Sequence, residues 1–397
     1  MNPNAAEHPG RILVVDDNQV NRKLLVQNLS LNGHMPETAE DGAQALEKLH
    51  SGSFDLVLLD IEMPNLDGFQ TLAALKQDTG LRHIPVIMIT AVDEMESAVR
   101  CIEMGAEDYL PKPFNPILLK ARIDASLEKK RLRDAEQVYL KSLEREFEIA
   151  REIQMDFLPA ELPQLPGWEL AVYFKAARNV AGDFYDVFEL LDGKVGLVIA
   201  DVCDKGVGAA LFMTLFRSLI RASATTDYFT GTADSSEDPV HARLRHAVTL
   251  TNNYIAETHG EKGMFATLFF GIVDPRTGKI AYINCGHEPP LIIHRNQDYS
   301  ALHKTGPAVG ILTDASFRIA ETTLREGDLF LAFTDGVPDT ENKQAQEFGR
   351  KWIADVSPEQ SATAVLHLIE TELHRHMDGS DQFDDITLLA LRRATQP

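Results

Sequence analysis

The sequence predicts a doubly wound α/β domain, a long helical linker and an α+β domain with antiparallel sheets. Three observations predict this organisation. Residues 10–125 alternate short apolar runs with amphipathic stretches. Residues 117–158 contain no Gly, and residues 159–397 follow a pattern of strands in hairpin spacing. A length of 397 residues suits two or three domains of roughly 100–200 residues each.

In residues 10–125, short runs that are apolar on both faces predict strands of a parallel sheet covered by helices on both sides. Amphipathic segments of helical spacing separate them. Five such βα units form an open sheet whose ligand site lies at the carboxyl ends of the strands. The predicted strands include Arg11–Val15, Phe54–Leu59, Pro85–Ile89 and Asp108–Leu110, and the predicted helices include Val20–Leu31, Gly42–Leu49, Gly68–Lys76 and Glu94–Met104.

Residues 126–158 are predicted to form a helical coiled-coil linker. Leu132, Ala135, Tyr139 and Leu143 are spaced by three, four and four residues, an eleven-residue pattern. About forty helical residues exceed what a small domain can cover, which favours a parallel dimeric coiled coil. We therefore expect a homodimer formed through this linker. One long helix that packs on its own domain remains the alternative.

Residues 159–397 are predicted to form an α+β domain with antiparallel sheets. Turn signals such as Asp192-Gly193 separate short apolar strands in hairpin spacing. The predicted strands are Glu169–Lys175, Lys194–Ala200, Met264–Val273, Lys279–Cys285, Pro290–His294, Asp328–Phe333 and Asp385–Leu391, and the predicted helices are Gly208–Ala222, Val240–Thr258 and Ser361–His376.

The composition excludes several functional classes. Lys plus Arg is 38 and Asp plus Glu is 60, which gives a net charge of −22 and argues against nucleic-acid binding. Three cysteines are too few for a disulfide framework or a zinc site. The N-terminus lacks the features of a signal peptide, and no apolar run approaches the ~20 residues of a membrane helix. We expect a cytoplasmic protein that does not bind a membrane.

Polar residues in the first domain follow several of its predicted strands. Asp16 and Asp17 follow the first strand, Asp60 ends the third, Thr90 ends the fourth and Lys112 follows the last. In a parallel sheet these ends meet at one edge, where three carboxylates would repel each other unless they surround a divalent cation. A hydroxyl and an ammonium beside them could hold a phosphoryl group attached to one carboxylate.

The first domain resembles the receiver domain of bacterial two-component response regulators. The matching motifs are VVDD (Val14–Asp17), LLDIEMPNLDGF (Leu58–Phe69), MITA (Met88–Ala91) and YLPKPF (Tyr109–Phe114). The resemblance implies phosphorylation of Asp60 by a sensor histidine kinase or another phosphodonor, and a cis peptide between Lys112 and Pro113. It further implies that Mg²⁺ binds to Asp17, Asp60 and the carbonyl of Glu62, with support from Asp16. Lys112 would contact the phosphoryl group. Thr90 and Tyr109 would reorient on phosphorylation.

Acids in the C-terminal domain also lie at strand ends. Asp183 lies in AGDFYDV, Asp201 in IADVCDKGVGAAL, Asp335 in FTDGVPD, and Asp384 and Asp385 in QFDDITLLAL. Four acids at one point would require cations, and hard oxygen ligands without a His or Cys cluster favour Mg²⁺ or Mn²⁺. Two such ions can share a water-derived ligand and hold a phosphoryl oxygen.

These motifs resemble the PPM-type serine/threonine phosphatases, specifically the bacterial SpoIIE/RsbU-like branch. NCGHEPPLI (Asn284–Ile292) adds to the resemblance. It implies two Mn²⁺ or Mg²⁺ ions held by the catalytic acids Asp183, Asp201, Asp335 and Asp384 and the carbonyl of Val202, with Asp385 as the other candidate of its pair. Arg178 could bind the substrate phosphate, although an ordinary surface arginine is an equal reading. Asp204 stands where relatives usually have Gly, and His287 fits a hydrogen-bonded turn better than an acid.

Together these features indicate a response regulator whose phosphorylation at Asp60 controls a metal-dependent protein serine/threonine phosphatase. The resemblance implies a phosphorylated anti-sigma-factor antagonist as the substrate. The alternative is a catalytically silent phosphatase-like adaptor that sequesters a partner under receiver control. Loss of one or two of the metal-binding acids would have favoured the adaptor, but all four are present.

Overall fold

The computed structural model describes residues 9–91, 95–190, 192–226 and 238–394. The chain divides into two compact units, residues 1–143 and 144–397. We describe each unit by itself.

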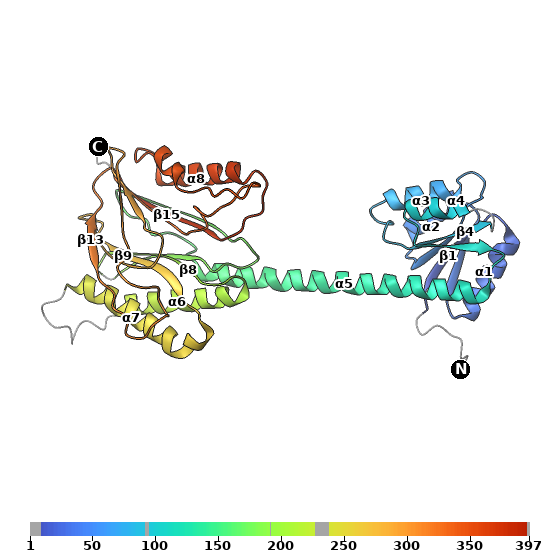
Figure 1. Cartoon of the computed structure of the whole chain (residues 1–397), viewed down its shortest axis with the longest axis horizontal. Helices are drawn as coiled ribbons and strands as arrows, with labels where there is room; N and C mark the ends of the chain where they lie inside the picture. The colour runs from blue at the N-terminus through green and yellow to red at the C-terminus, as the bar shows by residue number, and fades with distance from the viewer. Residues whose placement is uncertain (1–8, 92–94, 191, 227–237, 395–397) are drawn as a thin grey trace. The chain divides into compact units, whose positions relative to one another are not determined.

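The first unit contains a five-stranded parallel sheet in the order β2-β1-β3-β4-β5 (Figure 1), which confirms the predicted doubly wound α/β class. The one strand that the apolar pattern does not indicate is β2, because its residues lie at the edge of the sheet and most are only half-buried. The elements are β1 (Arg11–Val15), α1 (Gln19–Leu31), β2 (Met35–Ala39), α2 (Gly42–Ser51), β3 (Leu56–Asp60), α3 (Gly68–Gln77), β4 (Val86–Ala91), α4 (Met95–Glu103) and β5 (Asp108–Lys112).

Both faces of this sheet are covered, which is why its central strands are apolar throughout. Along β1, Leu13 and Val15 face a core shared with α2, α3 and α4, whereas Ile12 and Val14 face a core shared with α1 and α5. Alternation of side chains along a strand produces the two cores. The polar residues at the ends of the strands therefore project from a rigid frame.

A single helix, α5 (Pro116–Phe157), follows the sheet. Its first turns pack on the first unit through Leu119, Ile123 and Leu127. Between residues 132 and 153 its side chains are exposed or only half-buried. The predicted helix across the linker is thus present, with a long stretch that lacks packing within the described part of the chain.

The second unit contains two five-stranded sheets, in the orders β13-β10-β9-β8-β7 and β12-β11-β14-β15-β6. All of their strand pairs are antiparallel, as the hairpin spacing predicts. The strands are β6 (Trp168–Lys175), β7 (Phe184–Glu189), β8 (Val195–Val202), β9 (Ala266–Val273), β10 (Lys279–Cys285), β11 (Leu291–Ile293), β12 (Tyr299–Ala301), β13 (Ala320–Thr323), β14 (Leu329–Phe333) and β15 (Ile386–Arg393).

The two sheets face each other and helices cover their outer faces (Figure 1). Phe269 of one sheet and Phe330 and Leu389 of the other share the central core. The helices α6 (Val207–Thr225) and α7 (Pro239–His259) cover the first sheet, and α8 (Ala362–Met377) covers the second. This four-layer arrangement brings strand ends of both sheets to a common edge.

The expectation that no apolar run approaches the length of a membrane span is wrong for α6. Among the described residues, α6 is the one helix long and apolar enough to qualify by length and composition. Its Met213, Phe216 and Ile220 are buried in the core against the first sheet. The helix is apolar because it covers a sheet on one side and packs on α7 on another.

Candidate functional site

Three acids and a lysine meet at the carboxyl edge of the sheet in the first unit. Carboxylate oxygens of Asp16, Asp17 and Asp60 lie within 4.8 Å of one another. Among the described residues, Lys112 is the one cationic side chain that is hydrogen-bonded to Asp60. Lys112 Nζ lies 2.7 Å from Asp60 Oδ2 and 3.2 Å from Asp16 Oδ2. The structure therefore brings together the acids and the lysine that the strand ends predict.

The electrostatics at this edge favour a bound cation. Burial raises the pKa of Asp60 to about 6, although the hydrogen bond and charge of Lys112 act in the opposite direction. Burial also disfavours charge on Lys112, but Asp60 and Asp16 outweigh it and raise the pKa of that ammonium. Ionised oxygens that repel each other are suitable ligands for a hard divalent ion such as Mg²⁺.

The predicted switch residues lie on β4, which pairs with the strand of Asp60, and on β5, which pairs with β4. Thr90 is buried near the end of β4, and Tyr109 is half-buried on β5 with the Arg122 guanidinium 5.1 Å from its ring centroid. Glu62 is exposed two residues after Asp60, so its carbonyl lies on the segment that leaves the edge. The predicted cis peptide between Lys112 and Pro113 is confirmed.

In the second unit, strand pairing brings four acids together from two sheets. The antiparallel register pairs Phe184 of β7 with Ala200 of β8, so Asp183 and Asp201 are neighbours. In the other sheet β14 ends just before Asp335, and β15 begins just after Asp384 and Asp385. Because neighbouring antiparallel strands start and end side by side, one sheet contributes Asp183 and Asp201, and the other contributes Asp335 with either Asp384 or Asp385.

Two threonines that the sequence analysis missed join the sheets at Asp183. The hydroxyls of Thr334 and Thr387 each donate to Asp183 Oδ2 at 2.7 Å. Both threonines are fully buried. Hydrogen bonds from hydroxyls stabilise the ionised carboxylate and fix its orientation. The signal that could have revealed them is a polar residue directly before Asp335 and another two residues after Asp385, each in an otherwise apolar run.

The acids raise one another's pKa values. Burial, followed by the charges of Asp201 and Asp385, raises the pKa of Asp183. Burial, followed by Asp335, Asp384 and Asp385, raises the pKa of Asp201 to about 7. Burial, followed by Asp384, raises the pKa of Asp335 to about 6. Such a cluster costs free energy when it is ionised without cations, and two hard divalent ions would relieve the repulsion.

The two adjacent acids Asp384 and Asp385 differ in their partners. Asp385 accepts hydrogen bonds from the backbone N–H groups of Ala177 and Gly182, both at 2.7 Å. Asp384 instead pairs with Lys205, whose Nζ lies 2.9 Å from Asp384 Oδ2. The carboxylate of Asp385 is thus occupied in holding a loop, which supports the preference for Asp384 as a ligand.

Gly182 packs closely on the carbonyl oxygen of Val202, which the resemblance implies as a metal ligand. A Cβ at Gly182 would lie 3.0 Å from the carbonyl oxygen of Val202 and 3.3 Å from the Cβ of Ala209. A side chain larger than hydrogen would therefore push against this oxygen. The backbone of Val202 and the acids offer an all-oxygen donor set, which fits Mg²⁺ or Mn²⁺.

The remaining candidates have less specific surroundings. Arg178 is exposed on the loop before Asp183. Asp204 is an exposed turn residue with φ of 74°, a left-handed conformation that explains why Gly is usual at this position. His287 is buried, its Nδ1 lies 2.9 Å from Thr267 Oγ1, and burial lowers its pKa to about 3. A neutral, inaccessible histidine of this kind is a structural element of its turn.

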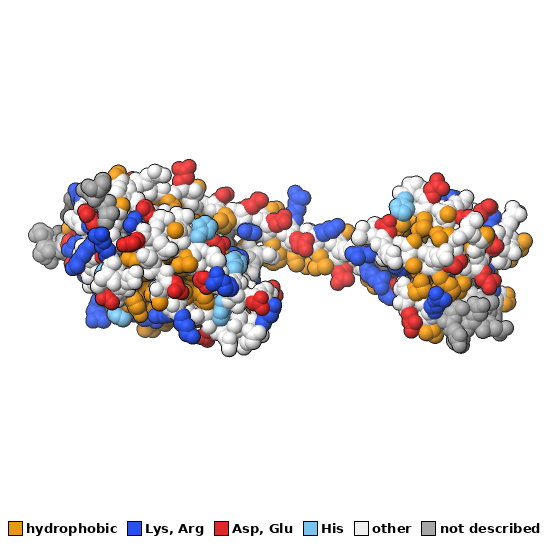
Figure 2. All heavy atoms as spheres, turned by 90° about the horizontal axis from the view of Figure 1, so that it is seen from above, with side chains coloured by type: hydrophobic (Ala, Val, Ile, Leu, Met, Phe, Trp, Pro, Cys, Tyr) orange, Lys and Arg blue, Asp and Glu red, His pale blue; other side chains and the backbone are white. Residues whose placement is uncertain are grey.

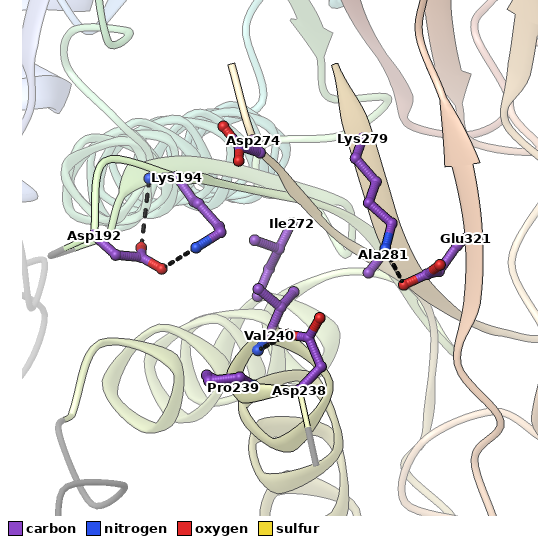
Figure 3. Close-up of a pocket in the computed structure, with 10 residues that line it drawn as sticks. All are labelled: Asp192, Lys194, Asp238, Pro239, Val240, Ile272, Asp274, Lys279, Ala281 and Glu321. Atoms are coloured by element: carbon purple, nitrogen blue, oxygen red, sulfur yellow. Dashed lines mark hydrogen bonds and ion pairs between the residues drawn. The ribbon is translucent and has the colours of Figure 1, made fainter. Parts of the chain in front are cut away.

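A separate pocket of about 270 Å³ lies at the opposite end of β8 from Asp201 (Figure 3). Asp238, His241 and Glu321 cluster there closely enough to hold an ion. However, Glu321 already pairs with Lys279 at 2.8 Å and with His241 at 2.8 Å. Lys279 thus compensates the charge of Glu321, and all three residues of the cluster are at least partly exposed.

Comparison with known proteins identifies both units. Residues 12–124 match the response regulator receiver domain, and residues 191–394, half of the chain, match stage II sporulation protein E (SpoIIE). The chain belongs to the SpoIIE family. It joins a receiver domain to a SpoIIE-type phosphatase domain of the PPM class.

Relatives of this SpoIIE-family protein match parts of the chain. Protein IcfG of Synechocystis is 42% identical over 262 residues, which cover 62% of this chain and 41% of that protein. Response regulator MprA of Mycobacterium ulcerans is 43% identical over 126 residues, which cover 32% of this chain and 53% of that protein. The chain thus spans about half, or less, of the curated relatives that it matches.

A solved structure supports the fold of the phosphatase domain. The SiaA-PP2C domain of Pseudomonas aeruginosa has a TM-score of 0.52 and 22% sequence identity, and the match covers 64% of this chain and 98% of that one. At this identity the similarity shows the fold alone.

Proposed function

We propose that this SpoIIE-family chain is a response regulator in which phosphorylation of Asp60 controls a metal-dependent protein serine/threonine phosphatase. The observation that carries the proposal is the convergence of Asp183, Asp201, Asp335 and Asp384 from two sheets. The raised pKa values of Asp201 and Asp335 support cation binding, because burial and neighbouring acids disfavour their ionised forms and positive charge would stabilise them.

Each acid has a role in this proposal. Asp183, Asp201, Asp335 and Asp384 hold two Mn²⁺ or Mg²⁺ ions, which would supply an activated water and neutralise charge on the phosphate. Thr334 and Thr387 orient the carboxylate of Asp183. Arg178, exposed on the adjacent loop, is in a position to meet a phosphate from solvent.

In the receiver domain, Asp60 accepts the phosphoryl group from a sensor histidine kinase or another phosphodonor. Asp16, Asp17 and Asp60 hold Mg²⁺ together with the carbonyl of Glu62. Lys112, 2.7 Å from Asp60, then binds the oxygens of the phosphoryl group. Thr90 and Tyr109 respond to the added charge, which is about two units.

The substrate and the setting follow from the resemblance to the SpoIIE/RsbU-like branch. We propose a phosphoserine or phosphothreonine on an anti-sigma-factor antagonist, in the cytoplasm. The domain boundaries we propose are 10–125 for the receiver, 126–158 for the linker and 159–397 for the phosphatase.

We further propose that the linker region of α5 pairs with a second copy of the chain. Leu132 and Tyr139 lie seven residues apart and are 64% and 67% exposed. Figure 2 shows apolar side chains interspersed with charged ones along this helix. A dimeric coiled coil would bury such residues. Light scattering should report a dimer that becomes a monomer when Leu132 and Tyr139 are replaced by Lys.

The test of the enzyme is phosphate release from a phosphoserine protein in Mn²⁺, with and without a small acyl-phosphate donor. We expect turnover in the wild type, loss of turnover in Asp335→Asn and loss of the donor effect in Asp60→Asn. A folded, metal-loaded wild type that binds the phosphoprotein without turnover would instead support the adaptor.

A further inference from the structure

Lys205 places a positive charge beside the four acids of the second unit. Its Nζ lies 2.9 Å from Oδ2 of Asp384. The charge of Asp384 in turn helps to raise the pKa values of Asp201 and Asp335, so these carboxylates and the ammonium share one electrostatic environment. Among the ion pairs of the described residues, the pair of Lys205 and Asp384 is the one that involves any of the four acids. Lys205 is therefore the cation that the chain itself supplies to the proposed metal site.

Two further contacts hold the ammonium, and neither uses the carboxylate of Asp384. Lys205 Nζ donates to the carbonyl oxygen of Phe383 at 2.9 Å and lies 3.8 Å from the centroid of the Phe383 ring. The negative face of an aromatic ring attracts a cation. Phe383 is 73% exposed, so these contacts hold the charge at the surface of the site, where a substrate arrives from solvent.

The backbone of Lys205 is fixed between two residues in left-handed conformations. Asp204 has a φ of 74° and Gly206 a φ of 84°. Asp204 Oδ1 also accepts a hydrogen bond from the N–H of Lys205 at 2.8 Å. The turn joins β8, which carries Asp201, to the first residue of α6, Val207. Because a strand and a helix anchor the turn, the positions that the ammonium can reach are restricted, as in a preorganised binding site.

The charge balance of the site leaves a role for this lysine. Two divalent ions would only balance the four carboxylates that hold them, whereas a phosphate group brings about two further negative charges. Asp339, whose charge also helps to raise the pKa of Asp335, adds to the repulsion of an anion. Hydrogen bonds from a lysine ammonium to phosphate oxygens are short and strong. A cation at the surface of the site would therefore favour binding of the phosphate.

We propose that Lys205 is a substrate-binding residue whose ammonium pairs with Asp384 in the metal-free protein and with the substrate phosphate in the metal-loaded protein. When Asp384 serves as a metal ligand, its carboxylate no longer needs Lys205, and the two contacts with Phe383 keep the ammonium in place. This inference rests on the proposed function and deepens it, because it names a second cation, in addition to Arg178, for the same phosphate.

The test uses the full chain with Asp60→Asn, here called the parent chain, so that the phosphoacceptor of the receiver does not contribute. Titration of inorganic phosphate into the Mn²⁺-loaded chain, followed by calorimetry, measures phosphate affinity, and titration with Mn²⁺ alone measures metal affinity. Lys205→Met removes the charge at similar length, and Lys205→Arg keeps it. Lys343→Met is the matched control, because this exposed lysine pairs with Asp378 instead of with one of the four acids.

We expect Lys205→Met to bind phosphate about 10-fold more weakly than the parent chain, the loss typical of a hydrogen bond to a charged group. Its Mn²⁺ affinity should be unchanged or higher, because the ammonium repels metal ions while it attracts phosphate. Lys205→Arg should bind phosphate more tightly than Lys205→Met, and Phe383→Leu, which removes the ring beneath the ammonium, should show a smaller loss. Lys343→Met should resemble the parent chain. If Lys205→Met does not fold, Lys205→Gln carries the comparison.

Two results would overturn the inference. One is unchanged phosphate affinity in folded, Mn²⁺-loaded Lys205→Met, which would mean that Lys205 only compensates the charge of Asp384 in the metal-free protein. The other is weaker Mn²⁺ binding in the same variant, which would mean that Lys205 supports the structure of the metal site. Failure of the proposed function is distinguishable, because it would appear in the wild type as an absence of Mn²⁺-dependent turnover.

Discussion

Replacing a predicted metal ligand should stabilise the metal-free protein, and Asp201→Asn provides the clearest case. Burial and three neighbouring acids raise the pKa of Asp201 from 3.8 to about 7. The folded state therefore binds a proton more tightly than the unfolded chain does. Stability falls as pH rises from about 4 to about 7, and the full cost is present above that range.

The size of the effect follows from this shift. A difference of about three pKa units corresponds to about 4 kcal/mol, which is an upper limit for the gain on replacing the carboxylate with a neutral amide. For metal-free Asp201→Asn at pH 8, we expect the free energy of unfolding to exceed that of the wild type by about 2–4 kcal/mol. This corresponds to a rise of at least about 4 °C in the unfolding midpoint. At pH 4 the variant and the wild type should be nearly equal.

The chain offers a convenient probe for this measurement. Its two tryptophans, Trp168 and Trp352, both lie in the phosphatase unit, so tryptophan fluorescence follows the unfolding of that unit. The experiment compares EDTA-treated wild type, Asp201→Asn and the exposed control Asp355→Asn at both pH values. Added Mn²⁺ should reverse the order, because only the wild type gains full binding energy. A metal-free Asp201→Asn no more stable than wild type at pH 8 would refute the reasoning.

Three further predictions concern the groups around the two sites. Thr387→Val removes a hydroxyl donor to Asp183 and should weaken Mn²⁺ binding, measured by calorimetry, about 10–100-fold. Thr251→Val is the control, because it deletes a buried hydroxyl that has no hydrogen-bond partner among the described residues. This control should leave the Mn²⁺ affinity unchanged. Lys205→Met removes the ammonium beside Asp384 and should strengthen Mn²⁺ binding up to about fivefold. Lys205→Arg keeps a positive charge there and should leave the Mn²⁺ affinity unchanged. Weaker Mn²⁺ binding in Lys205→Met would contradict the assignment of Asp384 as a ligand. Mg²⁺ binding to the receiver should decline as pH falls through about 6, where Asp60 takes up a proton, and equal affinity at pH 5 and pH 7.5 would exclude that assignment.

Much of the fold could be predicted because the signals are local. Strands such as Arg11–Val15 are apolar on both faces, and the predicted and observed bounds of this strand coincide. Missed strands had weaker patterns: Met35–Ala39 is a half-buried edge strand, and Phe184–Glu189 includes two acids. The apolar length of the helix Val207–Thr225 was not predicted. Its apolar residues cover a sheet, and the sequence of one segment does not show that contact.

The residues that hold the acids in place could not be predicted in the same way. Thr334 and Thr387 meet at Asp183 across 151 and 204 residues of sequence, and Gln154 meets Ala181 across 27. Such contacts depend on the strand register of two sheets and on the position of a helix against its domain. Neither is encoded in the spacing of a single segment.

The sequence by itself determined the class of each domain, the helical linker and the acids that follow the strands, because these depend on periodicity and on motifs a few residues long. Only the tertiary structure decided how Asp384 and Asp385 differ, since one carboxylate holds the loop backbone and the other faces Lys205. It also decided the electrostatics, because the pKa values of Asp60 and Asp201 rise through burial and through neighbours that are remote in sequence.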